Sequence, residues 1–197
     1  RARRFRGFSF TICMDPGSAG QAGPFEIDHP TTPRYEINPI HEGGSAVPIV
    51  ALIKETCEDL ISLYQKNPTR TKLLFPSYRK GENRISEQEA RFCFAAAVER
   101  ETEYRYSVET PTLETYSFTD GGGKISAQTD FTLWDLDGKA KEFDIEFKAH
   151  NPEPKSIEKD IEKLVREKTN GVWFHLFKNI DQGTFPALAG KFEEALL

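Results

Sequence analysis

Apolar side chains recur at helical spacing in three stretches of the chain. This spacing predicts helices over residues 48–65 and 156–168, and a last helix after Pro186. Between the first two stretches, Ser86 and Glu89 have the S-x-x-E spacing of a capping box, which satisfies free backbone N–H groups at a helix start. A further helix is therefore predicted to begin at Ser86.

After that helix, the period of the pattern changes from helical to two, as in strands that bury one face. Alternation predicts extended segments with intervening turns at residues 104–118, 125–133 and 143–149. Residues 172–177, VWFHLF, form a short apolar run that is typical of a buried strand. The order helix, three antiparallel strands, helix, strand predicts an α/β (α+β) fold with a mixed sheet flanked by helices.

The N-terminal part of the chain has a weaker pattern. Residues 8–12 alternate as on a short strand, and residues 15–44 are rich in Gly, Pro and Ser, which indicates a long loop. We therefore divide the chain into an N-terminal extension or subdomain, residues 1–75, and a core, residues 76–197. The role of the extension stays open between a partner interface, a recognition subdomain and an addition to the core sheet.

Composition and charge exclude several classes of protein. The 197 residues carry 26 basic and 31 acidic side chains, a net charge of −5, which argues against a protein that coats nucleic acid but not against an enzyme that grips it locally. No apolar run approaches the ~20 residues of a membrane span, and the start of the chain lacks the apolar stretch of a secretory signal. Three cysteines without a C-x-x-C motif argue against structural zinc, iron–sulfur clusters and disulfides, and predict a cytoplasmic protein.

Acidic residues lie in phase on two neighbouring predicted strands. Gln128 and Asp130 share one face of their strand, and Asp144, Glu146 and Lys148 share one face of the next. If the two strands pair as a hairpin, Asp130 and Glu146 meet on one cation. Hard divalent ions such as Mg²⁺ prefer carboxylate oxygens, and a nearby lysine stabilises charge that develops on a phosphoryl group.

The spacing D-x(15)-E-x-K, in the segments QTDFTLW and FDIEFKAH, resembles the restriction-endonuclease-like PD-(D/E)xK nuclease superfamily. That family's core order, α-β-β-β-α-β, is similar to the order predicted for residues 86–177. The residue before Asp130 is Thr129 rather than the proline of the motif. A second E-x-K triplet, Glu153-Pro154-Lys155, contains proline at a strand-to-helix junction and is set aside. The resemblance covers roughly half of the chain.

The resemblance implies a restriction-endonuclease-like core and a set of site residues. Asp130 and Glu146 would be the metal ligands, and Lys148 the catalytic lysine. Many family members place a glutamate on the first core helix facing the metal, for which this chain offers Glu87 and Glu89. Glu89 is equally explained as the partner of the Ser86 cap. The implied cofactor is Mg²⁺, with Mn²⁺ as a substitute.

The implied activity is a metal-dependent nuclease that hydrolyses phosphodiesters, first of all in DNA, with RNA left open. Defence against foreign DNA is the biological setting of many relatives, and many duplex-cutting nucleases act as homodimers or in larger complexes. A catalytically inactive module on the same fold, binding nucleic acid or protein, is the main alternative. A further alternative is that Asp144, Glu146 and Lys148 form the solvated face of an edge hairpin with cross-strand ion pairs.

Other charged residues are weaker candidates for contact with nucleic acid, since solvated surface charge explains them as well. They are Arg79, Lys80, Arg84 and Lys159. Near Lys159, Asp160 with Lys163 and Glu162 with Arg166 have the spacing of exposed helical ion pairs, although Lys159 or Lys163 facing a substrate groove stays an alternative.

Three further polar residues near the predicted strands have ordinary structural explanations. Gln128, two residues before Asp130, either contacts a water or phosphate in the site or is a polar residue on the strand face. His175 lies within an apolar run and is predicted to be a core histidine with satisfied hydrogen bonds. His150, near a strand end, is predicted to be a surface residue.

Overall fold

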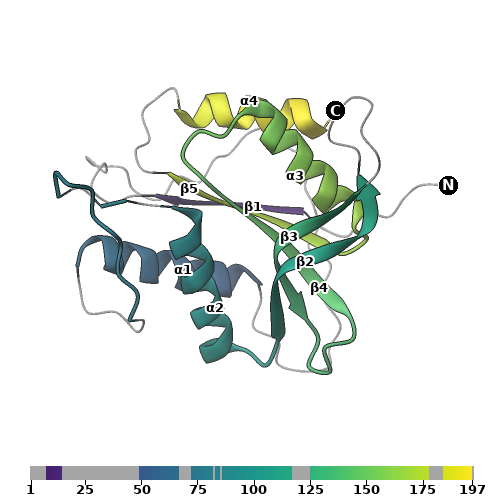
Figure 1. Ribbon diagram of the computed structural model, residues 1–197. Coiled ribbons are helices and arrows are strands. Elements are labelled where there is room, and N and C mark those ends of the chain that lie inside the picture. The colour runs from purple at the N-terminus through teal and green to yellow at the C-terminus, as the bar shows by residue number, and fades with distance from the viewer. Residues whose placement is uncertain are drawn as a thin grey trace, which may run out of the picture.

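The computed structural model describes residues 8–14, 49–66, 72–81, 83–84, 86–116, 125–177 and 184–196. A mixed β-sheet crosses the molecule, with helices on both of its faces (Figure 1). The predicted loop at residues 15–44 and the predicted turn between residues 117 and 124 lie outside the described residues. The predicted α+β class with a mixed sheet flanked by helices is confirmed.

The described elements follow one another along the chain as strands and helices with the following bounds. They are β1 (Phe8–Met14), α1 (Ile49–Tyr64), α2 (Glu87–Glu101), β2 (Arg105–Tyr116), β3 (Ile125–Trp134), β4 (Lys141–Ala149), α3 (Pro154–Arg166), β5 (Asn170–Phe177) and α4 (Thr184–Leu196). The sheet has five strands in the order β1-β5-β4-β3-β2. β4 pairs with β5 in parallel and with β3 antiparallel, which makes β4 the central strand.

Part of the predicted N-terminal extension belongs to this sheet. β1 runs parallel to β5, with Phe8 opposite Gly171 and Met14 opposite Phe177. α1 packs in the same hydrophobic cluster as α2 and the central strands, through residues such as Leu52. Of the three roles left open for residues 1–75, an addition to the core sheet is the one that β1 fulfils.

α2 begins with a capping box, and β2 contains an irregular stretch in its pairing with β3. The Ser86 backbone N–H donates to the Glu89 carboxylate at 3.0 Å, so the predicted capping box is present at the start of α2. β2 is one continuous strand, but its pairing with β3 is irregular between Pro111 and Thr115. Just before this irregularity, Glu109 has a φ of 50°, in the left-handed region that non-glycine residues seldom adopt.

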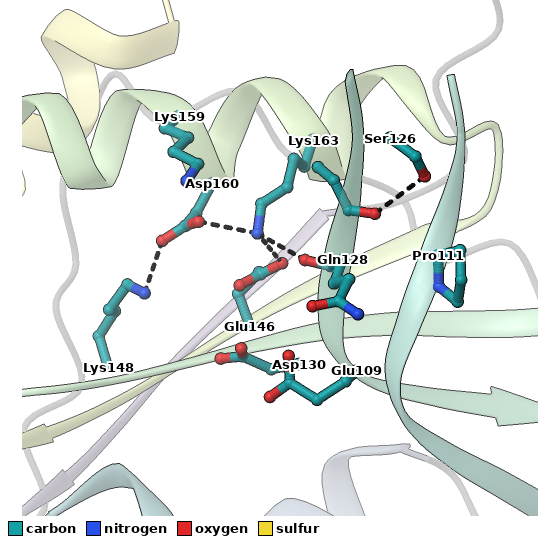
Figure 2. Close-up of a pocket in the computed structure, with 11 residues that line it drawn as sticks. Glu109, Pro111, Ser126, Gln128, Asp130, Glu146, Lys148, Lys159, Asp160 and Lys163 are labelled. Atoms are coloured by element: carbon teal, nitrogen blue, oxygen red, sulfur yellow. Dashed lines mark hydrogen bonds and ion pairs between the residues drawn. The ribbon is translucent and has the colours of Figure 1, made fainter. Parts of the chain in front are cut away.

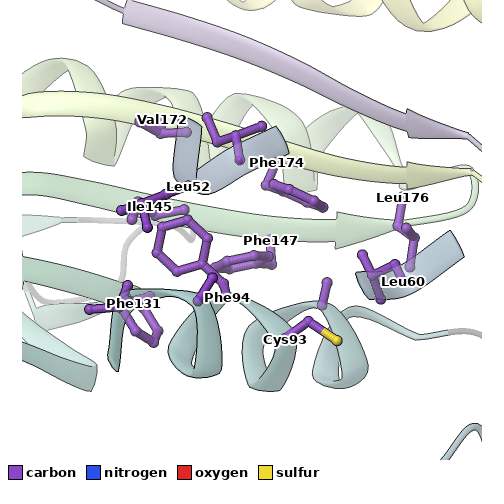
Figure 3. Packing of buried hydrophobic residues seen from close by; sticks show 14 of the residues in the cluster. Leu52, Leu60, Cys93, Phe94, Phe131, Ile145, Phe147, Val172, Phe174 and Leu176 are labelled. Carbon is purple, nitrogen blue, oxygen red and sulfur yellow. The ribbon is translucent and has the colours of Figure 1, made fainter. Parts of the chain in front are cut away.

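The larger hydrophobic core lies between the sheet and the helix pair α1–α2. The Phe94 ring of α2 meets Phe131 and Phe147 edge-to-face at centroid distances of 5.2 and 5.7 Å (Figure 3). A smaller cluster lies on the opposite face, where α3 and α4 pack on Trp173. The sheet is thus covered on both faces, as a central parallel pair requires.

The central strand β4 divides its side chains between the two faces. Phe143, Ile145 and Phe147 point into the larger core, as the alternation predicts. Asp144 and Glu146 lie on the α3 side and are fully buried, with 0% exposure. The alternative of a solvated edge hairpin is therefore wrong for these two residues, because their strand is central and α3 covers them.

His175 is a buried core histidine, as predicted, and His150 is exposed. The Nε2–H of His175 donates to the His150 carbonyl at 2.8 Å, and its Nδ1 accepts from the Trp173 indole at 3.3 Å. These partners fix the neutral tautomer, because a proton on Nδ1 would face another N–H group. Burial lowers the pKa of His175 from 6.5 to about 4.

This shift predicts a loss of stability in acid. Because the pKa is lower in the folded chain, the unfolded chain binds more protons between pH 6.5 and about 4. The contribution of His175 is complete above pH 6.5 and falls by about 3 kcal/mol on reaching pH 4. Urea unfolding at several pH values should show a shallower loss for His175→Gln than for the wild type. If the unfolding free energy of both proteins falls equally between pH 6.5 and about 4, His175 is not the group responsible for this loss.

Candidate active site

A cleft of about 540 Å³ opens on the α3 side of the sheet (Figure 2). Its lining comes from β2, β3, β4 and α3. The lining residues are Glu109, Pro111, Ser126, Ala127, Gln128, Asp130, Glu146, Lys148, Lys159, Asp160 and Lys163. The structure therefore brings together Asp130, Glu146 and Lys148, the three residues of the D…E-x-K pattern.

The cleft forms where β3 and β4 separate. Pairing between these strands ends at Phe131 opposite Ile145, whereas β3 continues along β2 and β4 continues along β5. Asp130 is the first residue of β3 beyond this pairing, and its Oδ2 accepts a hydrogen bond from the Phe147 N–H at 2.9 Å. A carboxylate thus takes the place of a strand carbonyl, which holds Asp130 against β4 at the floor of the cleft.

Glu146 is the most deeply buried carboxylate of the cleft. Its Oε1 lies 2.6 Å from the Lys163 ammonium, while its Oε2 has no hydrogen-bond partner among the described residues. Burial raises the pKa of Glu146 well above its usual range, and the negative charges of Asp130 and Asp160 raise it further. Lys163 opposes this shift. The site therefore has an excess of negative potential around Glu146.

Asp160 and Lys163 of α3 face this carboxylate instead of solvent. Their exposures are 3% and 4%, so the prediction of an exposed ion pair is wrong for them. The Lys163 ammonium lies 2.9 Å from Asp160 Oδ1, and Lys148 lies 2.8 Å from Asp160 Oδ2. The Glu162–Arg166 pair on the outer face of α3 is exposed as predicted, with 2.6 Å between nitrogen and oxygen.

Sequence reasoning did not find Arg91, which reaches the site from α2. Its guanidinium lies 2.6 Å from Asp130 Oδ1 and 2.8 Å from Glu109 Oε1. Glu87, one turn earlier on α2, lies 3.8 Å from the same guanidinium. The i,i+4 spacing of Glu87 and Arg91 was the available signal, but such spacing is common on exposed helices.

The two acidic candidates on α2 have different surroundings. Glu89 is buried and bound in the helix cap, with Arg84 at 3.3 Å on its other side. Burial raises the pKa of Glu87, the nearby Lys148 charge lowers it, and the Asp130 charge raises it again. Glu87, rather than Glu89, is therefore the α2 carboxylate that lies within electrostatic reach of Asp130.

The remaining candidates lie at the rim of the cleft or away from it. Gln128 and Lys159 line the cleft with exposed side chains, and the Gln128 carbonyl accepts from the Lys163 ammonium at 3.0 Å. Arg79 and Lys80 are exposed and are not among the residues that line the cleft. They are surface charges of the segment that precedes α2.

Asp130 and Glu146 are the carboxylates of the cleft that would hold a hard divalent cation, although Asp130 Oδ1 pairs with Arg91 and its Oδ2 accepts from the Phe147 N–H. Within the described ranges, no three His, Cys, Asp or Glu side chains are grouped as a ready-made metal site. The supporting observation is Glu146 Oε2, which is fully buried and has no hydrogen-bond donor among the described residues. Burying a carboxylate oxygen in this way costs free energy unless a cation binds it. Carboxylate oxygens are the ligands that Mg²⁺ and Mn²⁺ prefer.

Comparison with protein-family models, curated proteins and solved structures finds no match for this chain. Among the described residues, no helix combines the length and apolar character needed to cross a bilayer.

Proposed function

We propose that this chain is a divalent-cation-dependent nuclease with a restriction-endonuclease-like core, acting on phosphodiesters in DNA. The observation that carries the proposal is the buried Glu146 beside Asp130, since Glu146 Oε2 has no hydrogen-bond partner among the described residues and Lys148 lines the same cleft. The order α2, β2, β3, β4, α3, β5 supports the likeness to that core. The exposed Lys159 at the cleft rim supports contact with a polyanion.

In this proposal, Asp130 and Glu146 hold the cation. When bound, a cation such as Mg²⁺ polarises a phosphoryl oxygen and lowers the pKa of a water molecule. The Phe147 N–H keeps Asp130 in place, and the covering helix α3 keeps Glu146 away from bulk water. The carboxylates thereby keep a fixed geometry before substrate arrives, which lowers the reorganisation needed for reaction.

Lys148 supplies a positive charge next to the reacting phosphate. Burial alone would lower its pKa, but Asp160 at 2.8 Å, together with Asp130 and Glu146, raises the pKa above the usual lysine value. Lys148 therefore stays protonated at neutral pH and acts as an electrostatic stabiliser rather than as a base.

A second candidate function is binding without cleavage. The observation that favours it is that each buried carboxylate of the cleft already faces a cation of the chain: Asp130 faces Arg91, Glu146 faces Lys163, and Asp160 faces Lys148. A site balanced in this way is stable without a metal ion.

Cleavage assays on the whole chain separate the two functions. The protein is freed of metal, supplied with Mg²⁺ or Mn²⁺, and incubated with single-stranded DNA, duplex DNA and RNA. We expect cation-dependent cleavage of DNA that disappears in the Asp130→Asn/Glu146→Gln variant while circular dichroism shows a retained fold. Nucleic-acid binding without cleavage, and without Mn²⁺ binding in calorimetry, would instead favour the binding module. Cleavage of RNA but not of DNA would support cation-dependent phosphodiester hydrolysis with RNA, rather than DNA, as the substrate.

A further inference from the structure

Lys163 has an unusual position for a lysine in a phosphate-handling cleft. Its ammonium contacts three oxygens: Glu146 Oε1 at 2.6 Å, Asp160 Oδ1 at 2.9 Å and the Gln128 carbonyl at 3.0 Å. The contact with the Gln128 carbonyl is a hydrogen bond, and the contacts with the two carboxylate oxygens are ion pairs. With 4% exposure and these three oxygens around its ammonium, Lys163 is closed off from a substrate phosphate in the cleft.

The oxygens around Lys163 are of the kind that bind a divalent cation. Two carboxylate oxygens and one backbone carbonyl are hard ligands, which Mg²⁺ and Mn²⁺ accept. Glu146 Oε2, on the same carboxylate, is fully buried and lacks a hydrogen-bond partner among the described residues. The charges of Asp130 and Asp160 also act on Glu146, although Arg91 and Lys148 pair with these two acids, so the Lys163 ammonium offsets only part of the negative potential at Glu146.

An ammonium and a divalent cation cannot share Glu146 without strong repulsion. Two like charges about 4 Å apart in a buried site repel strongly, because little solvent screens them. If the ammonium leaves Glu146, Asp160 Oδ1 remains available to it, since Asp160 lies three residues earlier on the same helix. The flexible lysine stem thus permits an exchange within the cleft.

We propose that Lys163 is a built-in counter-ion of the cleft, and that a divalent cation binds by displacing its ammonium from Glu146. The inference rests on the proposed function, because it concerns the same cation. It explains how Glu146 stays buried in the absence of metal. It also means that part of the binding free energy of the cation is spent on moving Lys163, so the lysine weakens the affinity for metal.

Lys163→Met tests this exchange, because methionine keeps an unbranched, mostly apolar side chain and removes the charge. Calorimetry with Mn²⁺ alone, without nucleic acid, should show at least about tenfold tighter binding in the variant than in the wild type. The variant should have a lower Tm than the wild type without metal, and saturating Mn²⁺ should raise its Tm by more than that of the wild type.

Lys159→Met is the matched control. Lys159 lies on the same helix and lines the same cleft, but its side chain is exposed, so its removal tests the effect of a positive charge at the rim of the cleft. We expect a change in Mn²⁺ affinity of no more than about threefold, because solvent screens an exposed charge. If Lys163→Met fails to fold, Lys163→Gln keeps a donor for the Gln128 carbonyl and removes the same charge.

The outcomes separate this inference from the proposed function. Wild-type cleavage and Mn²⁺ binding, with unchanged or weaker Mn²⁺ affinity in both Lys163 variants, would overturn the inference and leave the nuclease intact. Absence of Mn²⁺ binding in every protein would overturn the nuclease and the inference together. Tighter binding in the Lys163 variants, without a comparable gain in Lys159→Met, supports the exchange.

Discussion

Lys148→Met is expected to lower the rate of DNA cleavage at saturating Mg²⁺ by about 10²–10³-fold, the usual effect of removing one preorganised donor from a developing negative charge. Lys148 is suited to this role because its one described ion pair, to Asp160, orients the ammonium without using all of its donors. Asp160 keeps Lys163 as a partner at 2.9 Å, so the variant should fold. Initial rates on a labelled oligonucleotide measure the effect.

Lys155→Met is the matched control for this variant. Lys155 belongs to the second E-x-K triplet of the chain, Glu153-Pro154-Lys155, and lies exposed in the first turn of α3, outside the cleft lining. Its replacement should change the rate by less than about twofold, as expected for a screened surface charge. Equal losses in both variants would show that the cleavage step depends on overall positive charge rather than on Lys148.

Metal binding distinguishes a loss of chemistry from a loss of the site. Removing the positive charge of Lys148 should not weaken the binding of Mn²⁺, because like charges repel. A Lys148→Met protein that neither binds Mn²⁺ nor cleaves would therefore mean that the cleft had collapsed. Retained binding with a strongly reduced rate is the result that assigns Lys148 to the reaction.

The parts of this site that the sequence predicts are those set by local periodicity. Alternation along β4 places Glu146 and Lys148 on one face and Phe147 on the other, because successive side chains of a strand point to opposite faces. The capping box at Ser86 is equally local, since its two partners are three residues apart. Such signals do not depend on what packs against the element.

The parts that the sequence does not predict depend on tertiary packing. Asp160 and Lys163 have the same i,i+3 spacing as an exposed ion pair, and only the position of α3 over Glu146 makes them buried. The apolar stripe of α3 indicates which of its residues face the core. For a charged residue beside that stripe, the sequence does not show whether the side chain faces the sheet or solvent. A buried carboxylate on the strand beneath α3 needs a cationic partner. No sequence pattern shows which lysine or arginine of the chain provides it.

Arg91 illustrates the same limit in a different way. The resemblance to PD-(D/E)xK nucleases predicts an acid on the first core helix, for which the sequence offers Glu87 and Glu89. The helix cap binds Glu89, and α2 brings a cation to Asp130 as well as the acid Glu87. The charges that neutralise the buried carboxylates therefore come from several elements around the cleft. Only the tertiary structure shows which elements these are.

Glu167→Ala is expected to destabilise the protein by about 3–5 kcal/mol, the cost of removing one member of a buried charged network. Glu167 follows α3 directly and is 1% exposed. Its carboxylate accepts from the backbone N–H groups of Leu113 and Glu114 at 2.8 and 3.1 Å, and from the Tyr116 hydroxyl at 3.0 Å. The Lys141 ammonium lies 3.4 Å away.

These contacts fasten the irregular half of β2 to the end of α3. Between Pro111 and Thr115 the pairing of β2 with β3 is out of register, so the Leu113 and Glu114 N–H groups rely on the carboxylate. Alanine would remove the acceptor of these two N–H groups and the carboxylate that accepts from the buried Tyr116 hydroxyl. Urea unfolding followed by circular dichroism should show the loss, with a Tm lower by about 10 °C.

Glu162→Ala is the control, because Glu162 lies on the same helix and pairs with Arg166 in an exposed position. Its loss should cost less than about 1 kcal/mol. The stability of Glu167→Gln should fall between those of Glu167→Ala and Glu162→Ala, since its amide keeps one acceptor and turns a donor toward the remaining N–H groups.

Pro111 of β2 borders the cleft, so a Glu167→Ala protein that still folds should also cleave more slowly. A cost below 1 kcal/mol for Glu167→Ala would mean that water can replace the carboxylate, and that pairing with β3 alone holds β2 in place.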